Sequence, residues 1–184
     1  SPSYGAPVGT ARRIGTPIRE VPVMADLSID LNGMAEAAQG AGLVFLCNPN
    51  NPTSTFHSGL SIATFIDDVR RSSPETMIQV DEAYIDYSED PIGGTAVPIA
   101  LDDPNVFVTR TFSKAYGMAG LRLGYAIGRP ETMQKIEAAW GLGSVNVLTA
   151  AAAIASLNDP AHMERERQEN ARVREFVHST FKGL

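Results

Sequence analysis

Residues 106–127 read VFVTRTFSKAYGMAGLRLGYAI, and this stretch decides the fold that we predict for the chain. Two strand-like apolar runs, residues 106–110 and 123–127, flank a short glycine-rich segment. A parallel connection between neighbouring strands needs about a dozen residues or more, usually with a helix, and this segment lacks room for a full crossover helix. We therefore expect these two strands to pair antiparallel.

The rest of the chain alternates between runs that predict strands and segments that predict helices. Predicted strands are residues 18–23, 43–47, 77–81, 106–110 and 123–127, and predicted helices are residues 32–38, 59–72, 130–139, 144–157 and 161–182. Continuous apolar strands imply a sheet that helices cover on both faces. The repeated strand–helix order predicts an α/β fold, a three-layer αβα sandwich with a mostly parallel mixed sheet.

Composition excludes several classes of function. The 184 residues carry a formal net charge of −6, which disfavours nucleic acid or an anionic membrane as a main partner. No apolar run approaches the ~20 residues of a spanning helix, and no signal peptide is visible. The single cysteine, Cys47, cannot form an internal disulfide and fits a reducing, cytoplasmic compartment. No Cys/His cluster has metal-ligand spacing, so we predict no metal site.

Polar clusters follow three of the predicted strands. Asn51 comes shortly after residues 43–47, Asp81 ends the next strand with Tyr84 close behind, and Lys114 follows residues 106–110. Open parallel sheets bind ligands outside the carboxyl ends of their strands. We therefore expect these clusters to converge on one ligand.

Lys114 is the candidate nucleophile. A lysine attacks a carbonyl only as the neutral amine, and its ordinary pKa is about 10.4, so the site must lower that pKa by burial or by nearby positive charge. Arg122 is placed to supply such charge, and Thr111 and Ser113 offer hydroxyl groups for a phosphate. The alternative is an ordinary surface lysine in a solvated loop.

Three motifs together resemble a known family. They are CNPNNPT at residues 47–53, DEAYIDY at residues 81–87 and RTFSKAYGMAGLRLGY at residues 110–125. The set resembles the fold-type I pyridoxal-phosphate enzymes, specifically the class I/II aminotransferases, and is most similar to the histidinol-phosphate aminotransferase branch. The resemblance covers nearly the whole chain. It implies pyridoxal 5′-phosphate as cofactor and a transaminase that moves an amino group through a Schiff base.

The resemblance also implies the catalytic roles. Lys114 would form the Schiff base and move a proton between substrate and cofactor. Asp81 would keep the pyridine nitrogen protonated, so that the ring accepts electrons. Tyr84 and Asn51 would hydrogen-bond the 3′-oxygen of the cofactor. Glu82 would point to the opposite side of the strand, and we interpret it as structural.

The remaining cofactor contacts come from two further places. Thr111, Ser113 and Arg122 resemble the phosphate-binding groups, since arginine offers a planar fork to phosphate oxygens. Tyr4 resembles the aromatic residue that stacks on the cofactor ring. One position departs from the family: Ser54 stands where glycine usually follows Asn-Pro-Thr. Glycine often serves a left-handed backbone position, so the geometry of this loop is open to question.

The resemblance further implies that residues 1–184 are the cofactor-binding large domain. The N-terminal arm and the C-terminal small domain would then lie outside the chain, and residues 161–184 would form the helix between the domains. Such a protein would be a cytoplasmic homodimer that acts in amino-acid biosynthesis on small amino acids and oxo acids. Because family sites are completed across the dimer, we expect the isolated chain to be inactive.

Three readings of the function stay open on the sequence alone. The first is a transaminase for an amino acid and a 2-oxo acid or related carbonyl, with histidinol phosphate and imidazole-acetol phosphate as the candidate pair. The second is a decarboxylase or other lyase that uses the same cofactor, since fold does not determine reaction type. The third is a non-catalytic sensor domain of a transcription regulator.

Overall fold

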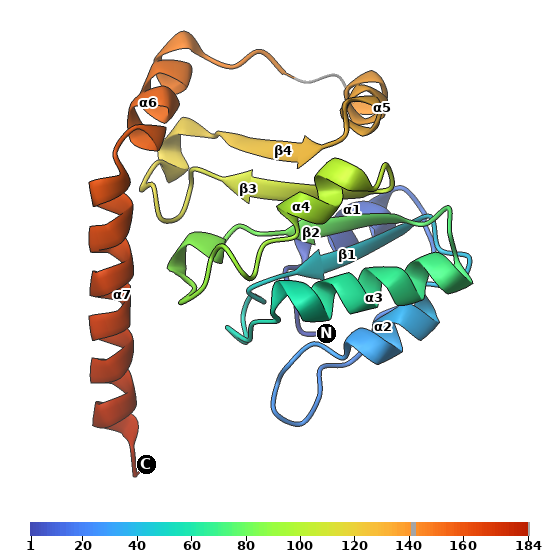
Figure 1. Ribbon diagram of the computed structural model, residues 1–184, viewed down its shortest axis with the longest axis horizontal. Coiled ribbons are helices and arrows are strands. Elements are labelled where there is room, and N and C mark those ends of the chain that lie inside the picture. Colours follow the sequence, from blue (N-terminus) through green and yellow to red (C-terminus); the bar gives the residue numbers. More distant parts are fainter. Residues whose placement is uncertain (141–142, 184) are drawn as a thin grey trace.

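The computed structural model describes residues 1–140 and 143–183, and in this part of the chain four strands form one sheet (Figure 1). Strands β1 (Leu43–Cys47), β2 (Met77–Asp81) and β3 (Val106–Thr111) are parallel, and β4 (Gly124–Gly128) pairs antiparallel with β3. The strands lie in the order β1-β2-β3-β4. The α/β class, the mostly parallel mixed sheet and the antiparallel last pair are confirmed.

Helices cover one face of the sheet closely. Strand residues at alternate positions point into this side, where α3 (Gly59–Ser72) and α4 (Val97–Asp102) lie against the sheet and α2 (Leu31–Ala37) packs on α3 (Figure 1). Ser58 caps α3 by accepting a hydrogen bond from Ser61 N, as N-terminal serines commonly do. The buried core contains Val44, Leu46, Ile78, Val80, Val106 and Val108 from the strands and Ile62, Phe65, Ile66 and Val69 from α3.

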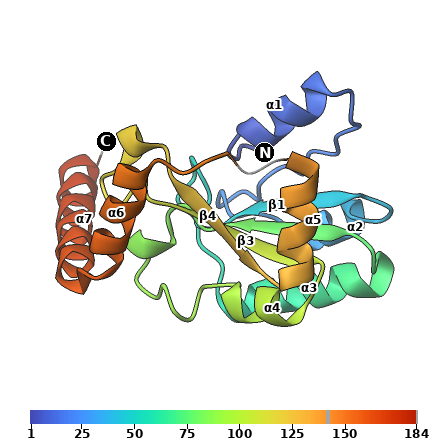
Figure 2. The ribbon, with the colours of Figure 1, turned by 90° about the horizontal axis from the view of Figure 1, so that it is seen from above.

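The opposite face of the sheet is more open. Helix α1 (Ala6–Arg13) lies on this side, away from α3 and α4, but contributes no buried residue (Figure 2). Strand side chains on this face, such as Phe45, Gln79 and Phe107, are therefore only half-buried. This face carries Asp81, which matters for the site.

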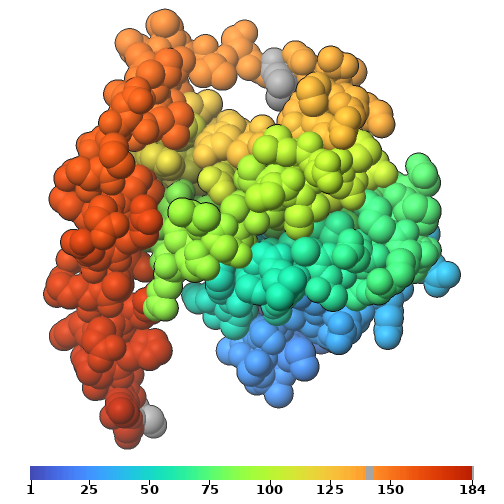
Figure 3. Space-filling view, viewed as in Figure 1, coloured from blue at the N-terminus to red at the C-terminus, as the bar shows by residue number. Residues whose placement is uncertain are grey.

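Three helices follow β4. They are α5 (Pro130–Trp140), α6 (Val147–Leu157) and α7 (Pro160–Phe181). Figure 3 shows α7, in red, along one side of the molecule, where it contacts the short 3₁₀ helix η1 (Ile85–Tyr87). A second 3₁₀ helix, η2 (Ala119–Leu121), precedes β4. Near its start α7 buries Met163, and His162 Nε2 lies 3.0 Å from the carbonyl oxygen of Ala115, so this helix is joined to the loop that carries Lys114.

The predicted strand at residues 18–23 is wrong, because the segment is an irregular connection. Pro17 and Pro22 lack the backbone N–H that a strand ladder needs, which explains why the segment does not join the sheet. Helices α1 and α4 were not predicted from the sequence. Within the described residues, no helix is long and apolar enough to cross a membrane.

Candidate functional site

The loop after β1 is closed by an asparagine that mimics a backbone group. Asn48 is fully buried; its Nδ2 donates to His57 O at 3.0 Å, and its Oδ1 accepts from His57 N at 2.8 Å. The N–H of Asn50 donates to Thr55 O at 2.9 Å inside the same loop. Reciprocal bonds of this kind leave the buried amide satisfied and hold the loop in one shape.

Asn51, Tyr84 and Lys114 come together at the carboxyl edge of the sheet. Asn51 Nδ2 donates to Tyr84 Oη at 3.5 Å, across the gap between the loops that follow β1 and β2. Lys114 Nζ lies 5.0 Å from the centroid of the Tyr84 ring, within the range of a cation–π contact. Three residues from three separate motifs therefore share one place in the fold.

Asp81 ends β2 on the more open face of the sheet. Its Oδ1 accepts hydrogen bonds from Ala83 N at 3.2 Å and from Thr109 Oγ1 at 3.3 Å, and Gln79 Nε2 donates to the same threonine hydroxyl at 3.2 Å. Burial raises the pKa of Asp81, and the adjacent Glu82 adds to the rise, while the bonds from Thr109 and Ala83 oppose it. The carboxylate is thus half-buried, and its hydrogen-bond donors are neutral groups.

Thr109 was missed by the sequence reasoning. It lies directly opposite Asp81 in the parallel pairing of β2 with β3, so its hydroxyl meets the carboxylate. Its only signal in the sequence is a threonine inside an apolar strand, and the register that places it beside Asp81 comes from the sheet.

Lys114 differs from expectation in its protonation. The side chain is exposed, and its pKa is raised, not lowered: the hydrogen bond and charge of Tyr84 raise it most, burial opposes the rise, and Tyr4 and Tyr87 add smaller contributions to it. Phenol oxygens stabilise the ammonium form, and the exposed position supplies little desolvation to oppose them. The expected lowering of this pKa is therefore wrong for the chain described here.

The three predicted phosphate-binding residues make separate local contacts in the turn after β3 and in η2. Thr111 Oγ1 accepts from Ser113 N at 3.0 Å and donates to Leu123 O at 3.3 Å, which shapes the turn after β3. Arg122 has a left-handed backbone, with φ 55°, and its Nη1 donates to Ala119 O at 2.8 Å. The guanidinium thus folds back on η2.

Tyr4 belongs to an irregular segment at the start of the chain. Its side chain is 46% exposed, yet it lies close enough to Lys114 to raise the pKa of that amine. Ser3 Oγ donates to Asn50 Oδ1 at 2.7 Å and so joins this segment to the loop after β1. The structure brings Tyr4, Asn51 and Tyr84 to the surroundings of one lysine.

A buried ion pair lies on the covered face, below the candidate site. Arg110 donates from Nε and Nη2 to Glu82 Oε2 at 2.9 and 2.8 Å, and the Glu82 side chain is fully buried. Thr95 Oγ1 and Ala96 N also donate to this carboxylate. Burial alone would lower the pKa of Arg110, but Glu82 outweighs it, so the pKa is raised. The structural interpretation of Glu82 agrees with these contacts.

Ser54 occupies the left-handed region, with φ 59°, and its side chain is exposed. A side chain with Cβ costs about 1–2 kcal/mol in this conformation, whereas glycine adopts it freely but loses part of the gain to the entropy of the unfolded chain. We expect Ser54→Gly to raise the free energy of unfolding by about 0.5–1 kcal/mol in urea titrations. Ser54→Ala keeps a Cβ in the left-handed conformation and should not raise the free energy of unfolding. An equal rise in both variants would contradict this account.

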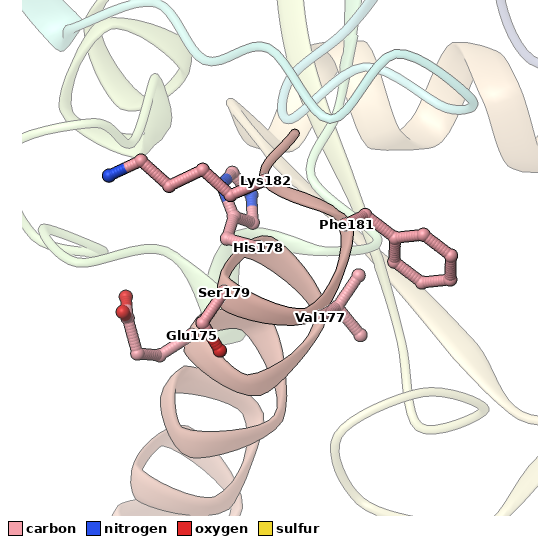
Figure 4. Close-up of a pocket in the computed structure, with 6 residues that line it drawn as sticks. All are labelled: Glu175, Val177, His178, Ser179, Phe181 and Lys182. Carbon is pink, nitrogen blue, oxygen red and sulfur yellow. The ribbon is translucent and has the colours of Figure 1, made fainter. Parts of the chain in front are cut away.

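None of these residues lines the open hollow at the far end of α7. Figure 4 shows that its lining comes from the last turns of the helix and the residue after it: Glu175, Val177, His178, Ser179, Phe181 and Lys182. Such a surface has no strand end and no converging loops. In the described part of the chain, no group of three or more His, Cys, Asp or Glu side chains is arranged to hold a metal ion.

Comparison with known proteins places this geometry in a family. The family described as aminotransferase class I and II matches residues 1–184. The chain is 41% identical to a histidinol-phosphate aminotransferase of Symbiobacterium thermophilum over 184 residues, which is 100% of this chain and 49% of that protein. It is 42% identical to an aromatic amino acid aminotransferase of Nocardia farcinica over 156 residues, 82% of this chain and 42% of that protein.

A solved structure extends the likeness to three dimensions. The histidinol-phosphate aminotransferase of Sinorhizobium meliloti in complex with pyridoxal-5′-phosphate superposes with a TM-score of 0.88 at 29% identity, covering 96% of this chain and 47% of that one. The chain spans about half the length of the curated relatives it matches.

Proposed function

Because this chain belongs to the family of class I and II aminotransferases, we propose that the full-length protein is a transaminase that depends on pyridoxal 5′-phosphate. It would move an amino group between an amino acid and a 2-oxo acid or related carbonyl. The observation that carries the proposal is the meeting of Asn51, Tyr84 and Lys114 beside the end of β2, where Asp81 lies.

The residues present fit this cofactor. Asp81 is a half-buried carboxylate held by neutral donors, and a protonated pyridine nitrogen is the kind of cation that would offset its partial burial. When bound, the cofactor supplies an electron-accepting ring that stabilises the loss of a proton next to the amino group. Asn51 and Tyr84 offer an amide and a hydroxyl to its phenolic oxygen, and Tyr4 an aromatic face. Thr111, Ser113 and Arg122 are the proposed phosphate-binding groups, and Arg122 would have to turn away from Ala119 to reach a phosphate.

Lys114 has the central role in this proposal. Its amine would attach to the cofactor's carbonyl carbon in the resting enzyme and, once released, would hold and return the proton at the substrate's α-carbon. Both steps need the neutral amine, while the exposed lysine of this chain favours the ammonium. We propose that the rest of the protein covers the site and lowers this pKa by burial.

The proposed domain organisation follows the same reasoning. Residues 1–184 would be the cofactor-binding large domain, and α7, within residues 161–184, would lead to a small domain. The full-length protein would be a cytoplasmic homodimer. That the full-length protein would be longer than this chain is supported by two relatives, of which the chain covers 49% and 42%.

For the substrate we propose histidinol phosphate with its imidazole-acetol phosphate product, supported by the 41% identical relative. Aromatic amino acids are the second candidate, supported by the 42% identical one. The test is to assay the full-length protein with each amino donor and 2-oxoglutarate and to compare kcat/KM. Formation of glutamate supports transamination. Carbon dioxide release without an oxo-acid product would favour a decarboxylase, and cofactor binding without turnover would favour a sensor domain.

Replacing Asp81 by asparagine should act in opposite directions on stability and on cofactor binding. A raised carboxyl pKa stabilises the fold fully below the ordinary pKa of 3.8, and this contribution is lost as the pH rises through the folded-state value. At pH 8 the cofactor-free Asp81→Asn protein should therefore melt at a higher temperature than the wild type, and the difference should shrink as the pH falls.

The same variant should bind pyridoxal 5′-phosphate more weakly, because the amide cannot offset a pyridinium charge. Thermal melts with and without cofactor at several pH values measure both effects. Asp67→Asn, at an exposed position on α3, is the control and should change neither. Tighter cofactor binding by Asp81→Asn would contradict the role proposed for Asp81.

A further inference from the structure

Asn50 uses its whole side chain to join two parts of the chain. The residue is 2% exposed. Its Nδ2 donates to Pro2 O at 3.1 Å and to Thr53 Oγ1 at 2.8 Å, and its Oδ1 accepts from Ser3 Oγ at 2.7 Å. One of these bonds closes the loop after β1, and the other two reach the segment that carries Tyr4.

Apart from Asn50, the segment around Tyr4 is held at Ser1, whose backbone is hydrogen-bonded to that of Val21 and Val23. Residues 1–5 form no helix or strand, and α1, which follows directly, buries none of its residues. A chain segment of this kind keeps a single conformation only where specific bonds offset its conformational entropy. The two bonds from Asn50 to Pro2 and Ser3 are such contacts, and they come immediately before Tyr4.

Asn51, the next residue, is bonded to a different part of the site. Asn51 donates to Tyr84, whereas Asn50 holds the segment of Tyr4, and both tyrosines act on the pKa of Lys114. Two consecutive residues of one loop are thus bonded, one to Tyr84 and the other to the segment that carries Tyr4.

We propose that Asn50 is a positioning residue, which ties residues 2–3 to the loop after β1 and thereby restrains the segment of Tyr4 on the side of the sheet edge where Asn51 and Lys114 lie. The inference rests on the proposed function for its consequence: a ring held there can contact an aromatic cofactor bound at the lysine. Asn50 itself touches no reacting atom in this account. It contributes by reducing the freedom that Tyr4 would otherwise lose on binding.

Side chains at either end of the Asn50 contacts allow a matched comparison. Ser3→Ala removes one bond to the Tyr4 segment and leaves the loop closure intact. Thr53→Ala removes the bond inside the loop and leaves the tether intact. Asn50→Ala removes the bonds to Pro2 and Ser3 and also the bond to Thr53 inside the loop. If Asn50 acts through Tyr4, Ser3→Ala should resemble Asn50→Ala, and Thr53→Ala should resemble the wild type.

The first measurement uses the cofactor-free full-length protein. Amide hydrogen exchange followed by mass spectrometry should show faster exchange in residues 1–9 for Asn50→Ala and Ser3→Ala, and wild-type exchange for Thr53→Ala. Unchanged exchange in both tether variants would overturn the proposal. Because Ser3 lies in the irregular segment at the start of the chain, its variant keeps the test decisive if Asn50→Ala fails to fold.

The second measurement is the affinity for pyridoxal 5′-phosphate together with the circular dichroism of its visible band. Loss of a hydrogen bond of about 1 kcal/mol corresponds to an affinity about fivefold weaker, with a reduced dichroic band. Tyr4→Ala should show the same loss, and Asn50→Ala should add nothing to it in the double variant. Additive losses would show that Asn50 acts independently of Tyr4. If the wild-type protein binds no pyridoxal 5′-phosphate, the proposed function is refuted. The hydrogen-exchange experiment would still show whether Asn50 restrains the segment of Tyr4.

Discussion

Replacing Lys114 by alanine in the full-length protein is expected to lower kcat for amino transfer by at least about a thousandfold. The amine is proposed both to attach the cofactor and to carry the substrate proton, and positioned proton transfer alone contributes about 10²–10⁴ in rate. No other lysine among the described residues lies against Tyr84 in the way that Lys114 does. Steady-state and single-turnover assays measure the loss, and the visible absorbance of the bound cofactor should change with it.

Lys135→Ala is the matched control for this variant. Lys135 is exposed on α5, outside the three motifs, and its removal should leave both rate and absorbance unchanged. If Lys114→Ala retained near wild-type turnover with an unaltered cofactor spectrum, the assignment of Lys114 would be wrong, and so would the proposed mechanism.

Arg110→Ala is expected to lower the free energy of unfolding by about 3–5 kcal/mol, because it leaves the fully buried Glu82 carboxylate without its cation. The remaining donors, Thr95 Oγ1 and Ala96 N, are neutral and cannot offset a buried charge. Urea unfolding followed by circular dichroism measures the change. A loss of this size is a large part of the stability of an ordinary domain.

Arg172→Ala provides the comparison for an ion pair in water. Arg172 donates to Glu169 at 2.6 Å one turn away on α7, with both side chains largely exposed. Exposed pairs contribute little, so this variant should unfold like the wild type. A similar loss of unfolding free energy in Arg110→Ala and Arg172→Ala would contradict the view that burial makes the Arg110–Glu82 pair the more stabilising one.

Several features of the fold could be predicted because local rules decide them. The connection between residues 106–110 and 123–127 is too short for a crossover helix, and β4 does run antiparallel to β3. Helix α3 follows from its apolar spacing and its capping serine, and its bounds agree with the prediction. In both cases the information lies within some twenty residues of sequence, where backbone geometry and periodicity act directly.

Other features could not be predicted because they depend on distant residues. Residues 18–23 were predicted to form a strand, but Pro22 within the segment and Pro17 just before it keep it out of the sheet, and the segment is irregular. Thr109 acquires its contact with Asp81 only through the register of β2 against β3. Arg122 carries the charge expected of a phosphate ligand, yet the turn at η2 directs its guanidinium to Ala119.

By itself, the sequence determined the fold class, the family resemblance and which residue types gather at the strand ends, since these depend on motifs and on short-range geometry. Only the tertiary structure decided how these residues meet: Asn51 on Tyr84, Tyr84 beside Lys114, and Asn50 on the segment of Tyr4. It also decided that Lys114 stays exposed with a raised pKa. The physical reason is that burial and charge at one atom are sums over neighbours from the whole fold, and the order of residues along the chain does not contain that sum.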